Sequence, residues 1–334
     1  MTNQPSAMIE VRDLVKVYPG DTRAVDGINF GIAPGELFGF LGPNGAGKTT
    51  TIRILATLLR ATAGSARVAG FDVAEQPGEV RKRLGLGMQT PALDAFSTGR
   101  ESLELAGRLH RMPTADVRHR ADELLELMGL TSVARKLTGT YSGGMKRRLD
   151  LASALMHRPP VLILDEPTEG LDPQSRAALW EELERINQTG TTMLLTTHYM
   201  EEADRLCSRL AIIDNGKIVV EGAPRDLKRQ VGTDTVVLQL PQANGDLASQ
   251  REAVRRLLDG WLAAEAVADH PTGVSLAVPN ASEAIPDLLR RLDGNGVHVA
   301  GLHMSQPSLD TVFMKYTGHS IRPEAADQPI ILGW

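Results

Sequence analysis

Short apolar runs alternate with segments of helical periodicity along the first two thirds of the chain, and this alternation predicts an α/β fold. Glu36–Leu41 and Val161–Leu164 are runs of strand length, and the second is continuously apolar, as in a parallel strand buried on both faces. Residues 50–59 have the pattern of a helix. Between residues 97 and 140 we expect a helical block whose apolar face contains Leu103, Leu105, Leu109, Leu124, Leu125 and Met128.

The pattern changes after Gln230. Strands are predicted over residues 235–240, 264–269, 273–278 and 296–302, and helices over 249–258 and 281–292. The resulting order, β-α-β-β-α-β, is that of ferredoxin-like domains, and a short helix is expected within 306–318. We therefore predict a main domain over residues 8–230, with its helical block at about 97–140, a small α+β domain over 231–318 and a tail over 319–334.

Composition limits the classes of protein to consider. The 334 residues suffice for about two domains, and the net charge of −5 argues against a general nucleic-acid-binding protein. No apolar run approaches the length of a membrane span, and residues 1–6 lack the basic start of a secretion signal, so any membrane component is expected to be a separate chain. The single cysteine, Cys207, suits a reducing cytoplasm, and we expect a half-buried structural thiol.

The segment from Gly42 to Thr50 matches the phosphate-binding pattern G-x-x-x-x-G-K-S/T between a predicted strand and a predicted helix. Glycines let backbone N–H groups turn toward a polyphosphate, and the helix N-terminus adds its dipole. Lys48 supplies a charge for the β- and γ-phosphates, and Thr49 a hydroxyl for Mg²⁺. The predicted phosphate contacts are Gly42, Asn44, Gly45, Ala46, Gly47, Lys48, Thr49 and Thr50.

Two acids follow the apolar strand Val161–Leu164. Asp165 lies where open α/β sheets bind ligands, and we expect it to hold Mg²⁺. Glu166, one residue later, is the candidate general base that polarises the attacking water. By themselves the two acids fit equally well as solvated residues at the end of a strand, and the phosphate-binding loop upstream favours the catalytic interpretation.

A second candidate anion site precedes these acids. Ser142 is a good N-cap for the helical pattern that follows, and Gly143 and Gly144 permit close approach of a ligand. Taken alone, this segment is more typical of an ordinary capped helix than of a binding site.

The order of these segments resembles the ATP-binding-cassette (ABC) ATPases over residues 9–230. Ser142, Gly143 and Gly144 are similar to the family's signature motif, and Gly170-Leu171-Asp172 resembles its D-loop. The resemblance implies that Tyr18 stacks on adenine, that Gln89 meets both Mg²⁺ and the membrane partner, and that His198 contacts the γ-phosphate. It implies a P-loop NTPase fold of ABC type, in which a RecA-like core carries an antiparallel β subdomain and a helical subdomain.

The resemblance also implies a dimer. In ABC ATPases two copies pair head to tail, and the signature helix of one copy closes over the ATP bound by the other. The residues Ser142, Gly143 and Gly144 would then serve the partner's nucleotide. An ATP-dependent homodimer with two composite sites is expected, and its closing and opening would drive transport.

Several residues depart from the usual family pattern. Met145 ends the signature where glutamine is usual, Tyr141 precedes it in place of leucine, and Thr90 follows Gln89 where many relatives carry an acid. Glu169 leads the D-loop in place of a small residue. Tyr141–Met145 and the short helix that ends at Thr317-Gly318 are similar to the ATPase subunits of ABC-2-type exporters, the daunorubicin/doxorubicin-resistance group in particular.

The expected function is therefore an ABC ATPase that binds MgATP, acts at the cytoplasmic face of the membrane and powers a separate permease for drug-like or hydrophobic molecules. Lys48, Glu166 and His198 are the predicted catalytic groups, and Thr49, Gln89 and Asp165 the predicted metal groups. Two alternatives remain open. One is a soluble, non-transport ABC ATPase acting on ribosomes or DNA, and the other is a stand-alone P-loop phosphotransferase.

Overall fold

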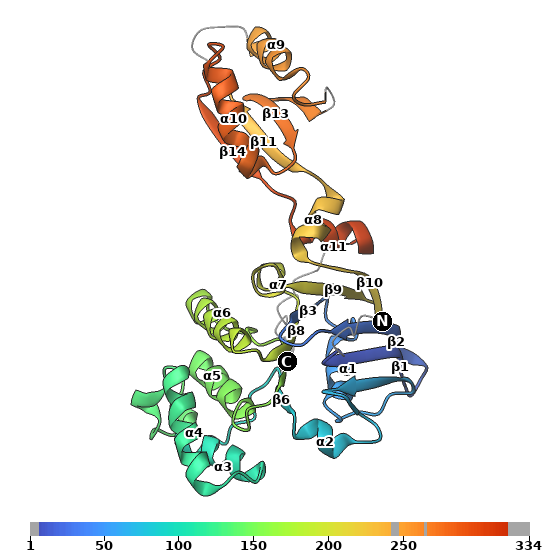
Figure 1. Cartoon of the computed structure of the whole chain (residues 1–334), viewed down its shortest axis with the longest axis vertical. Coiled ribbons are helices and arrows are strands. Elements are labelled where there is room, and N and C mark those ends of the chain that lie inside the picture. The colour runs from blue at the N-terminus through green and yellow to red at the C-terminus, as the bar shows by residue number, and fades with distance from the viewer. Residues whose placement is uncertain (1–6, 242–246, 264–265, 320–334) are drawn as a thin grey trace, which may run out of the picture. The chain divides into compact units, whose positions relative to one another are not determined.

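The computed structural model describes residues 7–241, 247–263 and 266–319. Contacts divide the chain into two compact units (Figure 1). The larger unit contains the described residues up to Pro224 and from Tyr316 onward, and the smaller unit is Arg225–Lys315. The predicted tail, 319–334, lies outside the described residues except for His319.

A six-stranded sheet with the order β10-β9-β3-β8-β7-β6 forms the centre of the larger unit. All neighbours are parallel except β9 and β10, which form a hairpin through the turn at Asn215-Gly216, where both residues have positive φ. Because β3, β7 and β8 are adjacent and parallel, the loops that follow them emerge at one edge. The strands are β3 (Leu37–Leu41), β6 (Leu84–Gly87), β7 (Val161–Asp165), β8 (Thr192–Thr197), β9 (Arg209–Asp214) and β10 (Lys217–Gly222).

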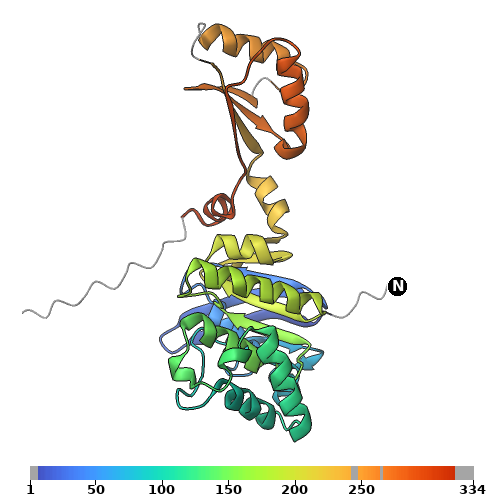
Figure 2. The same ribbon diagram turned by 90° about the vertical axis from the view of Figure 1, so that its left-hand side faces the viewer.

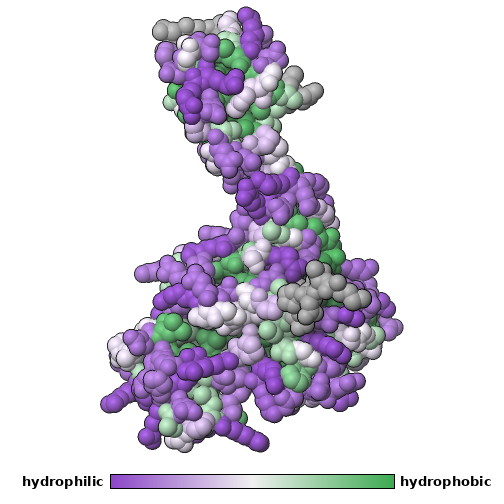
Figure 3. Space-filling view, in the orientation of Figure 1, coloured by the Kyte–Doolittle hydropathy of each residue, from purple (hydrophilic) through white to green (hydrophobic). Residues whose placement is uncertain are grey.

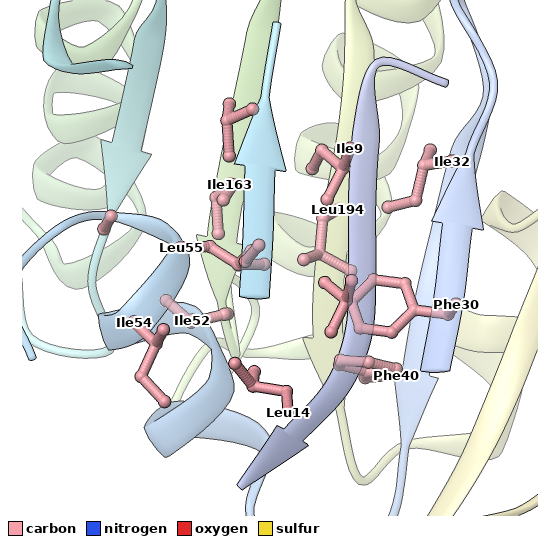
Figure 4. Close-up of a cluster of buried hydrophobic side chains, with 14 of the residues drawn as sticks. Ile9, Leu14, Phe30, Ile32, Phe40, Ile52, Ile54, Leu55, Ile163 and Leu194 are labelled. Carbon is pink, nitrogen blue, oxygen red and sulfur yellow. The ribbon is translucent and has the colours of Figure 1, made fainter. Parts of the chain in front are cut away.

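A second sheet of the larger unit is antiparallel, with the order β2-β1-β4-β5. Its strands are β1 (Ile9–Tyr18), β2 (Thr22–Ile32), β4 (Ala63–Val68) and β5 (Phe71–Asp72). The Phe30 ring of β2 lies 4.8 Å from the Phe40 ring of β3 in an edge-to-face arrangement, which joins the two sheets. Helix α1 (Lys48–Leu55) contributes Ile52 and Leu55 to the same core (Figure 4). This packing fixes the loop between β3 and α1 from both sides.

Helices form the rest of the larger unit, and Figure 2 shows the helical block in green at one end of it. The short α2 follows β5. In the block, α3 begins with a capping box between Thr98 and Glu101, and α3, α4 and α5 pack together. The helices are α2 (Pro77–Arg81), α3 (Gly99–Leu109), α4 (Thr114–Leu127), η1 (Thr131–Val133), η2 (Thr138–Thr140), α5 (Gly143–Ala154), α6 (Pro173–Gln188) and α7 (Met200–Leu206).

Two details of the prediction for this unit are wrong. Leu105 and Leu109 are exposed, because at roughly 100° per residue Leu105 lies on the side of α3 opposite the buried Leu103. Cys207 is fully rather than half buried. Its sulfur occupies the space beside Gly39 of β3, where an added Cβ would lie 2.5 Å from Sγ.

The smaller unit has a sheet of order β12-β13-β11-β14, in which all neighbours are antiparallel, as in a ferredoxin-like domain. Its core includes Val236, Leu276 and Leu288. Helices α8 and α11 lie at its two ends in the sequence. The elements are α8 (Pro224–Val231), β11 (Asp234–Gln239), α9 (Leu247–Leu258), β12 (Val267–His270), β13 (Gly273–Val278), α10 (Ala281–Asp293), β14 (Gly301–Ser305) and α11 (Leu309–Thr317).

The last strand of this unit begins later than predicted. The backbone N–H of Val297 donates to Leu292 O, and Gly296 has φ 75°, so residues 294–297 close the end of α10 instead of starting a strand. Ala300 N then bonds Gln239 O as the chain enters β14. In the second predicted strand, residues 264 and 265 lie outside the described residues, and β12 begins at Val267.

No helix in the described ranges is long and apolar enough to cross a bilayer. The face shown in Figure 3 is mostly hydrophilic, with hydrophobic colour in small patches.

The contact between α5 and α6 contains a carboxyl group that titrates near neutrality. Glu182 of α6 is buried, and its Oε1 lies 3.9 Å from Arg148 Nη1 of α5. Burial raises the pKa of Glu182 from 4.5 to about 7, although the charge of Arg148 opposes the shift. The folded protein therefore holds a proton that the unfolded chain releases, and this group costs stability as the pH rises from about 4.5 to about 7.

We expect Glu182→Gln to remove this pH-dependent loss, because glutamine fills the space without ionising. The free energy of unfolding of the variant, relative to the wild type, should rise by on the order of 2 kcal/mol between pH 5 and pH 8. Urea unfolding at both pH values measures the difference. Parallel pH dependences of the two proteins would contradict the assignment.

Candidate functional site

The loop between β3 and α1 forms a cradle in which side chains would clash at two glycines. A Cβ at Gly42 would lie 2.2 Å from Ile213 O, and one at Gly47 would lie 2.4 Å from Ala24 O. Gly47 also has φ 105°, a conformation that favours glycine. A cavity of about 240 Å³ opens beside this loop, lined by Pro43, Asn44, Gly45, Gly47, Lys48, Thr49, Thr50, Gln89 and Glu166.

Asp165, at the end of β7, is fully buried beside the start of α1. Its Oδ1 accepts hydrogen bonds from Thr49 Oγ1 at 3.2 Å and from Thr196 Oγ1 at 2.6 Å. Its Oδ2 is buried without a hydrogen-bond partner in the described part of the chain. A buried carboxylate oxygen without a partner is costly unless a cation binds it. The pair of Thr49 and Asp165 therefore fits a magnesium ion, which prefers such oxygen ligands.

Glu166 follows at once and lies between two donors. Lys48 Nζ is 3.0 Å from its Oε1, and His198 Nδ1 is 2.9 Å from its Oε2. Burial alone would raise the pKa of Glu166, but the hydrogen bond from His198 and the charge of Lys48 outweigh it and lower the pKa to about 2. The carboxyl is thus ionised at neutral pH, as a general base must be.

The backbone of Glu166 is strained, since its φ of 47° is uncommon for a residue with a side chain. Its N–H donates to both Thr196 O and Thr196 Oγ1 at 3.1 Å. Thr196 therefore contacts both acids. Its hydroxyl donates to the Asp165 carboxylate, and its carbonyl and hydroxyl oxygens accept from the Glu166 N–H. Its role was not predicted, and the only signal in the sequence is a threonine two residues before His198 at the end of a buried strand.

Lys48 is buried at the start of α1. Its Nζ donates to Gly42 O at 2.7 Å and to Pro43 O at 3.1 Å, in addition to its ion pair with Glu166. The ammonium group is thus held in the cradle by hydrogen bonds to carbonyl groups of the same loop.

Gln89 reaches the same cavity from the loop after β6. Its Nε2 donates to Glu169 Oε2 at 2.5 Å. Glu169 is the acid that departs from the family pattern at the head of the predicted D-loop. In the structure Glu169 is therefore the hydrogen-bond partner of Gln89, which is one of the predicted metal ligands.

Six of the residues predicted to bind the nucleotide do not line this cavity. Ser142 caps α5, and its Oγ accepts from Met145 N at 3.3 Å. At Gly144 an added Cβ would lie 2.9 Å from Ser175 Oγ, so this glycine lets α5 approach α6. Tyr18 ends β1, with Lys16 Nζ 5.4 Å from its ring centre. The residues concerned are Tyr18, Gly42, Ala46, Ser142, Gly143 and Gly144, of which Gly42 and Ala46 belong to the loop between β3 and α1.

Comparisons with known proteins agree with this geometry. Residues 25–169 match the family model described as ABC transporter, and residues 222–317 match that of the C-terminal domain of DrrA1-3-like ATP-binding proteins. The chain is 44% identical over 300 residues to the daunorubicin resistance ATP-binding protein DrrA2 of Streptomyces coeruleorubidus, covering 90% of this chain and 92% of the relative.

The chain is also 43% identical over 320 residues to the daunorubicin/doxorubicin resistance ATP-binding protein DrrA of Streptomyces peucetius, covering 96% of this chain and 95% of the relative. Among solved structures it resembles a dimeric ATP-binding cassette in a post-hydrolysis state with ADP and phosphate. The TM-score is 0.60 and the identity 25%, over 65% of this chain and 98% of the other.

The chain matches these relatives over nearly its whole length, and the ABC transporter model matches residues 25–169, which contain the cradle around Lys48 and the two acids at the end of β7. Such subunits bind ATP, dimerise and work with transmembrane permeases. The chain is therefore a member of the ABC transporter ATPase family, in the group of the daunorubicin/doxorubicin-resistance ATP-binding proteins.

Proposed function

We propose that this ATPase powers a permease that exports antibiotic or other drug-like molecules, and that it acts at the cytoplasmic face of the membrane. The proposed substrate class rests on the names of the two relatives, since both refer to resistance to daunorubicin-type drugs. The contacts of Lys48 and His198 with Glu166, which lines the cavity, support the proposed chemistry, because they place a phosphate-binding cation beside an ionised base.

Thr49, Asp165 and Gln89 would hold Mg²⁺ together with the nucleotide. The ion would supply charge neutralisation at the β- and γ-phosphates. Support comes from Asp165 Oδ2, which has no hydrogen-bond partner among the described residues, and from the position of Gln89 at the cavity wall. Asn44, Gly45, Ala46 and Thr50 would add backbone N–H groups around the phosphates.

Glu166 would accept the proton of the attacking water. His198 orients its Oε2, while Lys48 holds its Oε1. Once a γ-phosphate competes for Lys48, the pKa of Glu166 rises from its low value and the carboxylate becomes a stronger base. His198 would then contact the γ-phosphate from the same edge, and Tyr18 would stack on adenine.

The active assembly would be a head-to-tail homodimer that forms on ATP. Ser142, Gly143 and Gly144 do not line the cavity of their own chain, which favours a role at the partner's nucleotide. The N-terminus of α5 has the N–H groups and the dipole to bind a phosphate there.

Transport in inside-out membrane vesicles tests the proposed function. Vesicles that contain the chain and its permease should take up doxorubicin when MgATP is added. A Lys48→Ala chain should abolish this uptake, because the phosphate-binding charge is lost, and about 10³-fold lower turnover is expected. Thr98→Ala, which weakens only the cap of α3, is the matched control and should transport normally. ATP-independent uptake, or uptake that survives Lys48→Ala, would contradict the proposal.

A further inference from the structure

Arg147 of α5 connects the signature helix to the catalytic residues of its own chain. The side chain is buried, with 6% of its surface exposed. Its Nε donates to Pro167 O at 2.6 Å, and its Nη2 donates to Asp165 O and Glu166 O at 3.0 Å each. Its Nη1 donates to Gln89 O at 3.3 Å and also to Met88 O. The acceptors are the backbone carbonyls of Met88, Gln89, Asp165, Glu166 and Pro167.

This arrangement uses the planar fork of a guanidinium group. Three nitrogen atoms with fixed directions reach two separate segments, the loop after β6 and the loop after β7. A lysine ammonium group has one nitrogen and cannot span both. Burial of the charge is compensated by the carbonyl dipoles and by Asp150, 3.9 Å from Nη1.

The contact acts on the strained part of the site. Glu166 has a left-handed backbone conformation, which persists only where surrounding contacts hold it. Arg147 bonds the carbonyls on both sides of that residue as well as its own. Through Gln89 O it also fixes the loop that carries a predicted metal group.

Ser142, the N-cap of the same helix, lies five residues before Arg147, so roughly 7 Å along the helix separates the two. We infer that Arg147 is a positioning residue that sets Glu166 and the Gln89 loop according to the position of the signature helix. The inference rests on the proposed base role of Glu166 and on the proposed engagement of Ser142 with a partner's nucleotide. Each subunit thereby senses at its own base whether it has engaged the other subunit's ATP.

Arg147→Lys tests this inference, with Arg148→Lys as matched control. Arg148 is the next residue of the same helix, but its Nη1 donates to Met128 O in the helical block. For Arg147→Lys in the full chain we expect kcat for MgATP to fall about 100-fold, as for a base displaced by about 1 Å. The Kd for MgATP should stay within about twofold, since the cradle is intact. Arg148→Lys should keep both values.

A second variant covers the case in which a lysine is not tolerated at the buried position. Arg147→Gln removes the charge and should show the same split between kcat and Kd. When combined with Glu166→Gln, Arg147→Lys should still allow ATP to dimerise the chain, because the surface of α5 that meets the partner is unchanged.

Wild-type kcat in both Arg147 variants overturns the inference, as does an equal loss of kcat in Arg148→Lys. Loss of ATP-driven dimerisation, or a rise in Kd that matches the fall in kcat, overturns it as well. Failure of the proposed function is distinguishable, since in that case Glu166→Gln alone retains turnover.

Discussion

Replacement of Glu166 by glutamine is expected to lower steady-state ATP hydrolysis by about 10³-fold while leaving ATP binding intact. Glutamine has nearly the same shape but cannot accept the proton of the attacking water at neutral pH. It can still accept a hydrogen bond from Lys48 and lie beside His198. Because ATP then persists in the site, the dimer should accumulate, and size-exclusion chromatography with MgATP should show twice the mass of the free chain.

The control for this experiment is a second buried glutamate in the same unit. Glu182→Gln makes the same chemical change between α5 and α6, away from the cavity, and should hydrolyse ATP at the wild-type rate. Normal turnover in Glu166→Gln would exclude Glu166 as the base. Lost turnover together with lost ATP binding would indicate a damaged cradle rather than a missing base.

Replacement of Ser142 by arginine is expected to abolish ATP hydrolysis without affecting nucleotide binding by the isolated chain. The arginine would project where a partner's nucleotide is proposed to bind, and it would lose the cap on Met145 N. The cap accounts for only about 1 kcal/mol of stability. A phosphotransferase that acts alone has no use for this segment, so it would keep its activity.

Mixing two inactive variants shows whether the site is shared. Lys48→Ala inactivates the cradle of its chain, and Ser142→Arg inactivates the signature of its chain. In a mixed dimer, one site therefore combines the intact cradle of the Ser142→Arg chain with the intact signature of the Lys48→Ala chain. An equal mixture should recover at most about a quarter of the wild-type rate, because about half of the dimers are mixed and each has one working site of two. No recovery on mixing, with each variant folded and able to dimerise, would place Ser142 and Lys48 in a site within one chain.

Sequence patterns predict the strands and loops of this site well because its chemistry depends on local spacing. The cradle, the acids Asp165 and Glu166 and the histidine after β8 each lie at the end of a buried strand, and parallel strands bring their ends to one edge. The ferredoxin-like order of the smaller unit follows from alternating patterns in the same way. The family model of the DrrA-like C-terminal domain matches residues 222–317, which include nearly all of the domain expected from these patterns over residues 231–318.

Contacts between distant segments are not predictable from such patterns. Gln89 and Glu169 are 80 residues apart, and nothing in either loop indicates the hydrogen bond between them. Arg147 looks like one of several basic residues on an amphipathic helix, whereas its function depends on two loops that meet only in the fold. The late start of β14 likewise depends on how α10 ends, through a bond from Val297 to Leu292.

The burial of Cys207 has a practical consequence for measuring the proposed closure of the dimer. The chain has no other cysteine, and the Cys207 sulfur is enclosed against Gly39, with a pKa raised by burial. Maleimide reagents require an accessible thiolate, so they will pass over the native residue. A single cysteine introduced on an exposed helix can therefore carry a fluorescent label while Cys207 stays in place, and its packing against Gly39 of β3 is left unchanged.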